Sequence, residues 1–194
     1  MVPALLLLWL CGGALRITIL AVPPVVPLLH ADLQLGQTGI SVLSALPTLM
    51  FAWAAIPGAF LIARLGAVQT LTAGLVVTAA ASAMRGVAQG TWLLFASTLV
   101  MGMGVAIMQP SLPPLVRAWL PDRVGLGTAV YTNGILVAQV LVVGLTIPYL
   151  LPFLYGSWRL SLVVWSVPVA LTALVAVALR GRLPRPATLP KATK

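Results

Sequence analysis

Long apolar runs, separated by short polar, glycine-containing or proline-containing breaks, form the main pattern along this chain. Each run is close to the ~20 residues that an α-helix needs to cross a hydrocarbon core of about 30 Å. A membrane β-barrel would instead show alternating segments of roughly ten residues. The pattern therefore predicts an all-α integral membrane protein with six transmembrane helices, at residues 4–29, 38–63, 68–88, 92–115, 124–150 and 160–179.

The composition supports this prediction and narrows the functional class. Of 194 residues, 61% are hydrophobic and 7% are charged, whereas a soluble domain carries about 25% charged residues. A single cysteine, Cys11, excludes an internal disulfide framework and a cysteine metal cluster, and we interpret it as a small packing residue. We expect a multi-pass protein of the cell membrane, that is, the inner or plasma membrane.

The distribution of basic residues predicts the orientation. If the amino terminus is cytoplasmic, the inside receives three arginines of the short loops and five basic residues of the tail, and the outside receives only Arg85 and Arg159. Basic residues concentrate on the cytoplasmic side of membrane proteins, so both termini are predicted to be cytoplasmic. The inside residues are Arg64, Arg117, Arg123, Arg180, Arg182, Arg185, Lys191 and Lys194.

The last of these residues form a basic, proline-rich tail. We divide the chain into a membrane domain, 1–180, and this cytoplasmic tail, 181–194, which is expected to face anionic lipid rather than nucleic acid. Its polar composition is typical of a natural stop or of a linker after the sixth helix. The first apolar run is expected to be retained, because it is too long for a signal-peptide core and lacks a basic start.

No constellation typical of an enzyme is present in the sequence. There is no glycine-rich phosphate loop ending in lysine, no cluster of histidine and acidic residues for a metal, and no serine with a nearby base. We therefore expect no enzymatic activity, no metal and no cofactor.

Proline and small residues indicate how the helices pack. Prolines fall late in the first span and inside the second and fourth, where neighbouring helices or water must satisfy the freed backbone groups. Small residues allow close approach of helix backbones. The prolines are Pro23, Pro24, Pro27, Pro47, Pro57, Pro110, Pro113 and Pro114, and the small residues are Gly102, Gly104, Ala106, Gly125 and Gly127.

Arg16 lies in the middle of the first apolar run, within "GGALRITIL". A cation at the centre of a bilayer costs about 2.5–3.5 kcal/mol on insertion scales. The chain has two acidic residues, Asp32 and Asp122, and both are predicted to lie outside the hydrocarbon. Two interpretations follow: Arg16 binds an anionic substrate through its planar fork, or it binds backbone carbonyls or hydroxyls and holds helices together.

Other polar residues share helix faces and are candidates for lining a cavity. Amides in hydrocarbon need partners, so they either bind substrate or join helices, and a hydroxyl can also bond to the preceding turn. The predicted substrate-binding set is Arg16, Thr48, Gln109, Tyr131, Asn133 and Gln139. Thr48 follows Ser41 and Ser44 on one face of the second span, and Thr128, Thr132 and Ile135 accompany Tyr131 and Gln139.

Aromatic and ionisable residues add two expectations. Tryptophans near helix ends suit the membrane interface, and Trp53, deeper in its helix, is a candidate substrate contact; the set is Trp53, Trp92, Trp119 and Trp158. No acidic residue lies in a predicted span, and the single histidine, His30, lies at the outer end of the first. Because proton-coupled carriers use such groups as relays, we expect facilitated diffusion or anion exchange.

The short basic turn "GAFLIARLGA" between the second and third spans resembles the corresponding loop of the major facilitator superfamily, in its amino-terminal six-helix half. Arg64 and Gly66 match the arginine and second glycine of that loop, whereas Ala63 and Ala59 replace its acidic residue and first glycine. The resemblance implies a transporter in which Arg64 and Gly66 belong to a gating loop.

Three further stretches resemble the cyanate-porter branch of that superfamily: "LRITILAVPPVVPLL", "GMGVAIMQPSLPPLVRAWLPDRVGLGTAVYTNG" and "WRLSL". This resemblance implies transport of a small anion by alternating access. Cyanate, nitrate, nitrite and small carboxylates make similar demands on one guanidinium.

Transporters of that superfamily have about twelve helices in two halves, with substrate bound between them. The predicted six helices correspond to one half. A parallel homodimer would restore the two-fold arrangement, since closed pairs are the commonest oligomers. The alternatives are a non-transporting fragment and a subunit completed by a separate carboxy-half polypeptide.

Overall fold

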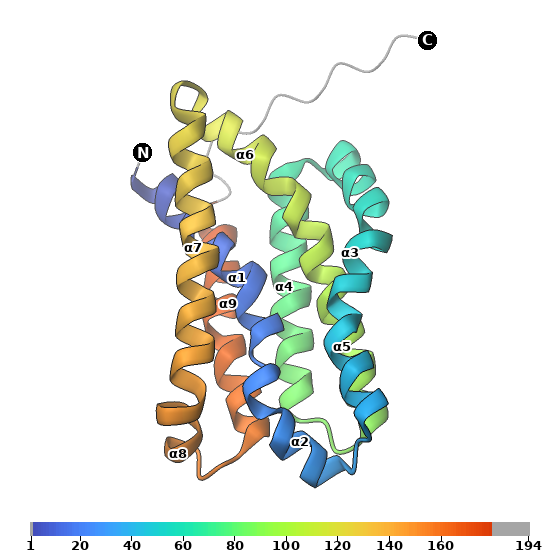
Figure 1. Ribbon diagram of the computed structural model, residues 1–194. Coiled ribbons are helices and arrows are strands. Elements are labelled where there is room, and N and C mark those ends of the chain that lie inside the picture. The colour runs from blue at the N-terminus through green and yellow to red at the C-terminus, as the bar shows by residue number, and fades with distance from the viewer. Residues whose placement is uncertain (1, 180–194) are drawn as a thin grey trace.

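The structure is a computed structural model that describes residues 2–179, and at positions 54 and 55 the backbone only. Throughout this range the chain forms helices joined by short connections, and it contains no strand there. The long helices run side by side as one bundle (Figure 1). The predicted tail, 181–194, lies outside the described residues.

Each predicted apolar run coincides with one helix or with a series of helical segments. In chain order the elements are α1 (Val2–Leu20), η1 (Pro23–Val25), α2 (Val26–Leu33), α3 (Gln37–Leu65), α4 (Ala67–Gly86), α5 (Thr91–Met108), η2 (Gln109–Ser111), α6 (Leu112–Trp119), η3 (Pro121–Arg123), α7 (Val124–Leu145), η4 (Thr146–Leu150), α8 (Leu151–Phe153) and α9 (Trp158–Leu179). Within residues 2–179, five helical stretches are long and apolar enough to cross a membrane, and α3 makes a sixth if its two parts count as one span.

Proline explains where the helices break. Pro23 and Pro24 have no backbone N–H to continue α1, and the chain there turns through η1 into α2. Pro110 marks the passage from α5 through η2 to α6. The two parts of α3, Gln37–Trp53 and Ile56–Leu65, meet at 54°, and Pro57 cannot donate to the carbonyl of Trp53 across this bend.

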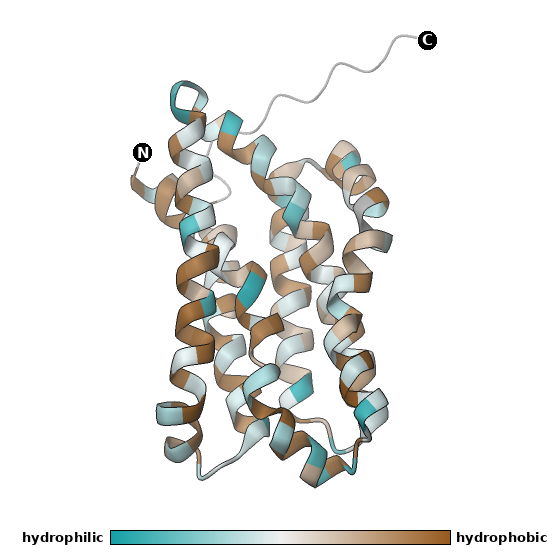
Figure 2. Cartoon of the chain, in the orientation of Figure 1, coloured by the Kyte–Doolittle hydropathy of each residue, from teal (hydrophilic) through white to brown (hydrophobic). Residues whose placement is uncertain are grey.

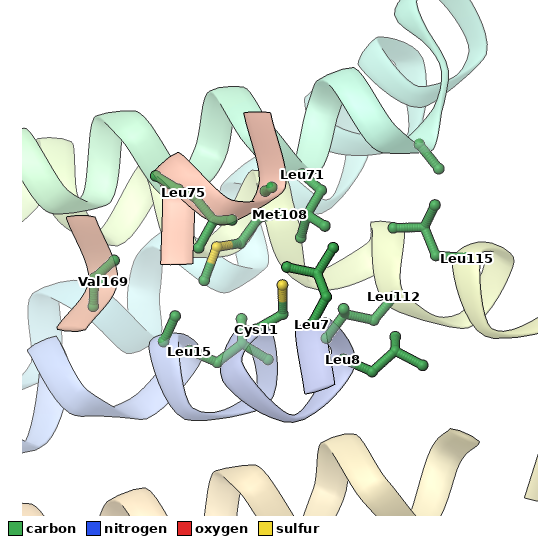
Figure 3. Packing of buried hydrophobic residues seen from close by; sticks show 14 of the residues in the cluster. Leu7, Leu8, Cys11, Leu15, Leu71, Leu75, Met108, Leu112, Leu115 and Val169 are labelled. Atoms are coloured by element: carbon green, nitrogen blue, oxygen red, sulfur yellow. The ribbon is translucent and has the colours of Figure 1, made fainter. Parts of the chain in front are cut away.

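Pairwise helix contacts define the arrangement. α1 packs on α7 and α9, α4 packs on α5 and α9, and α3 packs on α5. In Figure 1 α3 and α7 lie at opposite edges of the bundle. Figure 3 shows the buried core, which includes Leu7, Leu8 and Leu15 of α1 together with Leu71 and Leu75 of α4. Cys11 is buried in the same cluster, so its interpretation as a packing residue is confirmed.

Glycines mark the closest helix contacts. A Cβ at Gly104 of α5 would meet the backbone of Gly74 and Thr78 of α4, and one at Gly102 would meet Pro47 and Met50 of α3. These two contacts confirm the predicted close packing of the fourth span. A Cβ at Gly127 would meet Val116 and Leu120, whereas one at Gly125 would have no neighbour within 4 Å, so the prediction for Gly125 is wrong.

The outer surface of the bundle is largely apolar. Large hydrophobic side chains are exposed along α3 and α7, among them Leu49, Ile56, Leu136 and Val140. Figure 2 shows hydrophobic residues over the length of the helices and hydrophilic residues mainly towards their ends. A surface of this kind suits lipid along the helices and water or headgroups at their ends.

Candidate functional site

A pocket of about 330 Å³ lies among α1, α3, α5, η2, α6 and α7. It is bordered by both edge helices, through Phe51 of α3 and through Tyr131 of α7. Most of its lining is apolar. The lining residues are Leu15, Phe51, Ala106, Gln109, Pro110, Leu112, Pro113, Tyr131 and Ile135.

Two predicted substrate-binding residues, Gln109 and Tyr131, line this pocket. Gln109 begins η2, where the proline that follows it ends the regular turns of α5, and its side chain is exposed. Tyr131 is half-buried on α7. The amide of Gln109 and the phenol of Tyr131 each offer a hydrogen-bond donor, and no acidic side chain lies among the lining residues.

Thr48 and Gln139, two further predicted substrate-binding residues, do not line the pocket. Thr48 is exposed and lies three residues before Phe51, so the helical repeat places both on one face of α3. Gln139 is half-buried and lies one turn after Ile135 on α7. Phe51 and Ile135 line the pocket, and Thr48 and Gln139 do not.

Asn133 is engaged between helices. Its Oδ1 accepts a hydrogen bond from the Trp9 indole N–H at 3.0 Å, and this bond joins α7 to α1. Asn133 is therefore held in the interhelical contact that was the alternative interpretation for the amides. The sequence placed Asn133 off the stripe of Tyr131 and Gln139, which was the available signal for this different role.

Arg16 is half-buried on α1. A Cβ at Gly12 would meet the Tyr131 backbone, and one at Gly13 would lie close to Gly134 and Ala138. Since Arg16 follows these glycines by four and three residues, it lies on the side of α1 that faces α7. Within residues 2–179 its guanidinium forms no hydrogen bond and no ion pair. Leu15, the residue before it, lines the pocket.

The predicted gating loop is a one-residue turn. α3 ends at Leu65 and α4 begins at Ala67. Gly66 between them has φ 85° and ψ 157°, a conformation that only glycine adopts readily. Arg64 is exposed, and its guanidinium carbon lies 4.3 Å from the centroid of the Phe60 ring.

Arg85 was assigned to the outside of the membrane, but the structure buries its side chain completely. It lies in the last turn of α4 and donates to the Thr18 carbonyl oxygen at 2.7 Å and to Ser82 Oγ at 3.0 Å. The signal for burial was present in the sequence, because the predicted third span continued past Arg85 to residue 88.

Asp32 connects two spans at the same end of the bundle. It pairs with Arg159 at 2.6 Å and accepts from the Trp158 indole N–H at 3.0 Å. Trp158 is only 4% exposed, and Trp119 is buried as well, so the prediction that they anchor at the membrane interface is wrong. Trp53 and Trp92 are exposed, as that prediction requires.

No group of three or more histidine, cysteine, aspartate or glutamate side chains that could hold a metal occurs in the part of the chain that the structure describes. Among the predicted site residues, Gln109 and Tyr131 place an amide and a phenol on the lining of the apolar pocket, and Arg16 does not line it.

The chain is similar to two proteins that are described as transport proteins. An uncharacterized transporter, YycB, of Bacillus subtilis (strain 168) is 32% identical over 173 residues, which cover 86% of this chain and 42% of the relative. The cyanate transport protein CynX of Escherichia coli (strain K12) is 26% identical over 172 residues, covering 89% of this chain and 44% of the relative. The chain thus spans less than half the length of these relatives.

The family model of the Major Facilitator Superfamily matches residues 8–194, nearly the whole chain. Its match agrees with the all-helical bundle, with the apolar spans and with both transporter relatives. This multi-pass membrane chain belongs to the Major Facilitator Superfamily.

Proposed function

We propose that the protein is a half-size secondary transporter that moves a small anion, such as cyanate, nitrate, nitrite or a small carboxylate, by alternating access. The single observation that carries the proposal is Arg16, a half-buried cation without a protein partner in the described residues. Family membership supports the transporter class. The printed name of the CynX relative supports a small anion as cargo.

The position of Arg16 favours a ligand over a structural clasp. A clasp would hydrogen-bond to backbone carbonyls or hydroxyls, and Arg85 provides an example of such a contact at the Thr18 carbonyl. Arg16 has none within residues 2–179. Because its planar fork matches a carboxylate or a small oxyanion, a bound anion is the partner that the site requires.

The pocket supplies the surroundings for such an anion. Gln109 and Tyr131 offer neutral donors beside apolar side chains, and neutral donors stabilise an anion without adding charge. Thr48 and Gln139 also belong to the proposed substrate-binding set. The pocket volume of about 330 Å³ exceeds the volume of a small inorganic anion. The proposal therefore includes closure of the pocket by a second bundle.

We propose a parallel homodimer as the functional unit, because the chain spans 42% and 44% of its full-length relatives. A two-fold axis normal to the membrane would place two copies of Arg16 across one central cavity. Each copy raises the positive potential at the other, and a bound anion relieves the repulsion. Binding and closure would thus be coupled, as alternating access requires.

A second candidate is a subunit that requires a separate carboxy-half partner or, without one, transports nothing. The same coverage of the relatives favours it, because both relatives carry further sequence beyond the matched region. The two assemblies differ in what lies opposite Arg16: a second arginine or an unrelated side chain.

We place the protein in the cell membrane with both termini in the cytoplasm, on the count of basic residues. In this orientation Arg64 and Gly66 form a gating loop at the cytoplasmic end. The described spans contain two acidic residues, Asp32 and Asp122, and each lies near one end of its span. We therefore propose that the protein transports its substrate by facilitated diffusion or by anion exchange.

The test is uptake of labelled nitrate and cyanate by proteoliposomes that contain the purified chain alone. Arg16→Lys keeps the charge but loses the fork, so uptake should fall at least about tenfold, the value of a charged hydrogen bond, and Arg16→Gln should abolish it. Arg117→Gln, which removes a charge from an exposed position on α6, is the control and should transport like the unaltered protein.

Expression and native mass are measured for each variant, and a dimer should persist in all of them. Normal uptake by Arg16→Gln would refute the substrate-binding role. A monomer without uptake would refute the homodimer and favour the subunit with a separate partner.

A further inference from the structure

The carboxyl end of α1 leaves backbone carbonyls without helical partners. The last bond in the regular pattern runs from the Ala21 N–H to the Ile17 carbonyl at 3.0 Å. The next carbonyls, of Thr18, Ile19 and Leu20, would need donors four residues later. Pro23 and Pro24 supply none to Ile19 and Leu20, and the Val22 N–H forms no bond to the Thr18 carbonyl.

Arg85 supplies the missing donor at Thr18. Its Nη2 lies 2.7 Å from the Thr18 carbonyl oxygen, and its side chain is fully buried. A cation at a helix carboxyl end also interacts favourably with the helix dipole. The bond crosses from the end of α4 to the end of α1, two residues after Arg16.

The same residue connects a third helix. The Thr18 hydroxyl donates to the sulfur of Met101 on α5 at 3.3 Å, and Thr18 is itself fully buried. The end of α1 is thereby fixed to α4 through its carbonyl and to α5 through its side chain. The Thr18 side chain lies on the side of α1 opposite the direction of Arg16, because two residues rotate a helix by about 200°.

We propose that Arg85 is the positioning residue for Arg16. It holds the broken end of α1 against α4, and so fixes the direction in which the Arg16 guanidinium is presented to the anion. This inference rests on the proposed function of Arg16. It assigns to a buried cation, which is costly inside a membrane bundle, a role in anion affinity that is separate from contact with the anion.

The matched variants are Arg85→Met and Ser82→Ala. Methionine keeps the length and burial of the side chain, removes a buried charge and loses the bond to α1. Alanine at position 82 removes the other partner of Arg85 within α4 and leaves the bond to α1. Arg85→Lys restores one charged donor.

Hydrogen–deuterium exchange is measured on the full chain in lipid nanodiscs, and nitrate uptake is measured in proteoliposomes. In Arg85→Met the amides of residues 17–21 should lose protection about tenfold or more, as expected for loss of a charged hydrogen bond. The KM for nitrate should rise by a similar factor with little change in kcat. Arg85→Lys should recover part of both effects, and Ser82→Ala should show neither.

Unchanged hydrogen–deuterium exchange at residues 17–21 in Arg85→Met would overturn the proposal that Arg85 holds the end of α1 against α4. Faster exchange with an unchanged KM would overturn the positioning role. If Arg85→Met accumulates poorly, Arg85→Gln, which is too short to reach α1, replaces it under the same two criteria. Failure of the proposed function has a different signature: uptake would then be insensitive to Arg16→Gln, while the exchange measurement still decides whether Arg85 holds α1.

Discussion

Replacing Gly134 with alanine adds one methyl group to α7 at the point where this helix packs on α1. The new Cβ would lie 3.0 Å from the carbonyl carbon and 3.2 Å from the Cα of Trp9, and closer still to the Trp9 carbonyl oxygen. All three neighbours are backbone atoms, so no change of rotamer relieves the contact. The two helices must separate.

The expected change in stability of Gly134→Ala follows from two opposing effects. Overpacking of a tight contact costs about 1–3 kcal/mol, whereas alanine is a better helix former than glycine by about 1 kcal/mol. Gly144, on the same helix, has no neighbour within 4 Å of its would-be Cβ. The gain in helix propensity is common to both positions, so Gly134→Ala should be less stable than Gly144→Ala by about 1–3 kcal/mol.

Unfolding of both variants in detergent, followed by circular dichroism at matched lipid content, measures this difference. Gly134→Ala should unfold at a lower temperature than the unaltered protein, and Gly144→Ala at the same or a higher temperature. Tyr131 and Ile135 lie beside Gly134 on α7 and line the pocket, so nitrate uptake should fall in Gly134→Ala. Equal stability of the two variants would refute the claim that α1 and α7 meet through this glycine.

Two further predictions concern the ends of the bundle. Gly66→Ala should lower the free energy of unfolding by about 1–3 kcal/mol, because Gly66 has a backbone conformation that is essentially limited to glycine. Gly36→Ala, at φ −65°, is the control. Equal effects of the two changes in thermal unfolding would contradict the claim that Gly66 requires glycine. Asp32→Asn should lower the free energy of unfolding by at most about 1 kcal/mol, because its ion pair with Arg159 is partly exposed. This loss of stability should shrink at high salt. A loss of several kcal/mol in denaturant titrations would contradict the expectation for a partly exposed pair.

The helices could be predicted from the sequence because their apolar runs are long and contain only two charged residues, Arg16 and Arg85. The positions of breaks were also accessible, since Pro23 and Pro24 remove donors that α1 needs to continue. The close contacts between helices could not be predicted from the sequence in the same way. A glycine in a membrane span is a close contact only if another backbone lies beside it, which holds for Gly104 and fails for Gly125.

The candidate site was predicted in part for a related reason. Residue type identified Gln109 and Tyr131 as polar groups that need partners, and both line the pocket. The partners themselves are set by tertiary structure. Asn133 bonds to Trp9, which lies 124 residues away in sequence, and the Trp158 indole bonds to Asp32 instead of lying at the interface.

Arg16 and Arg85 are both cations among apolar helices, but they differ in their hydrogen-bond partners within this chain. The Nη2 of Arg85 donates to a carbonyl at the end of α1, whereas its Nε and Nη1 are buried without a partner in the described residues. Arg16 has no such partner in the described residues, and covering it with an apolar surface would leave a buried cation unpaired. In a homodimer the opposing surface brings a second Arg16 and no carboxylate, so closure depends on an anion. A separate carboxy-half partner with a carboxylate opposite Arg16 would neutralise it directly, and closure would then occur in the absence of substrate.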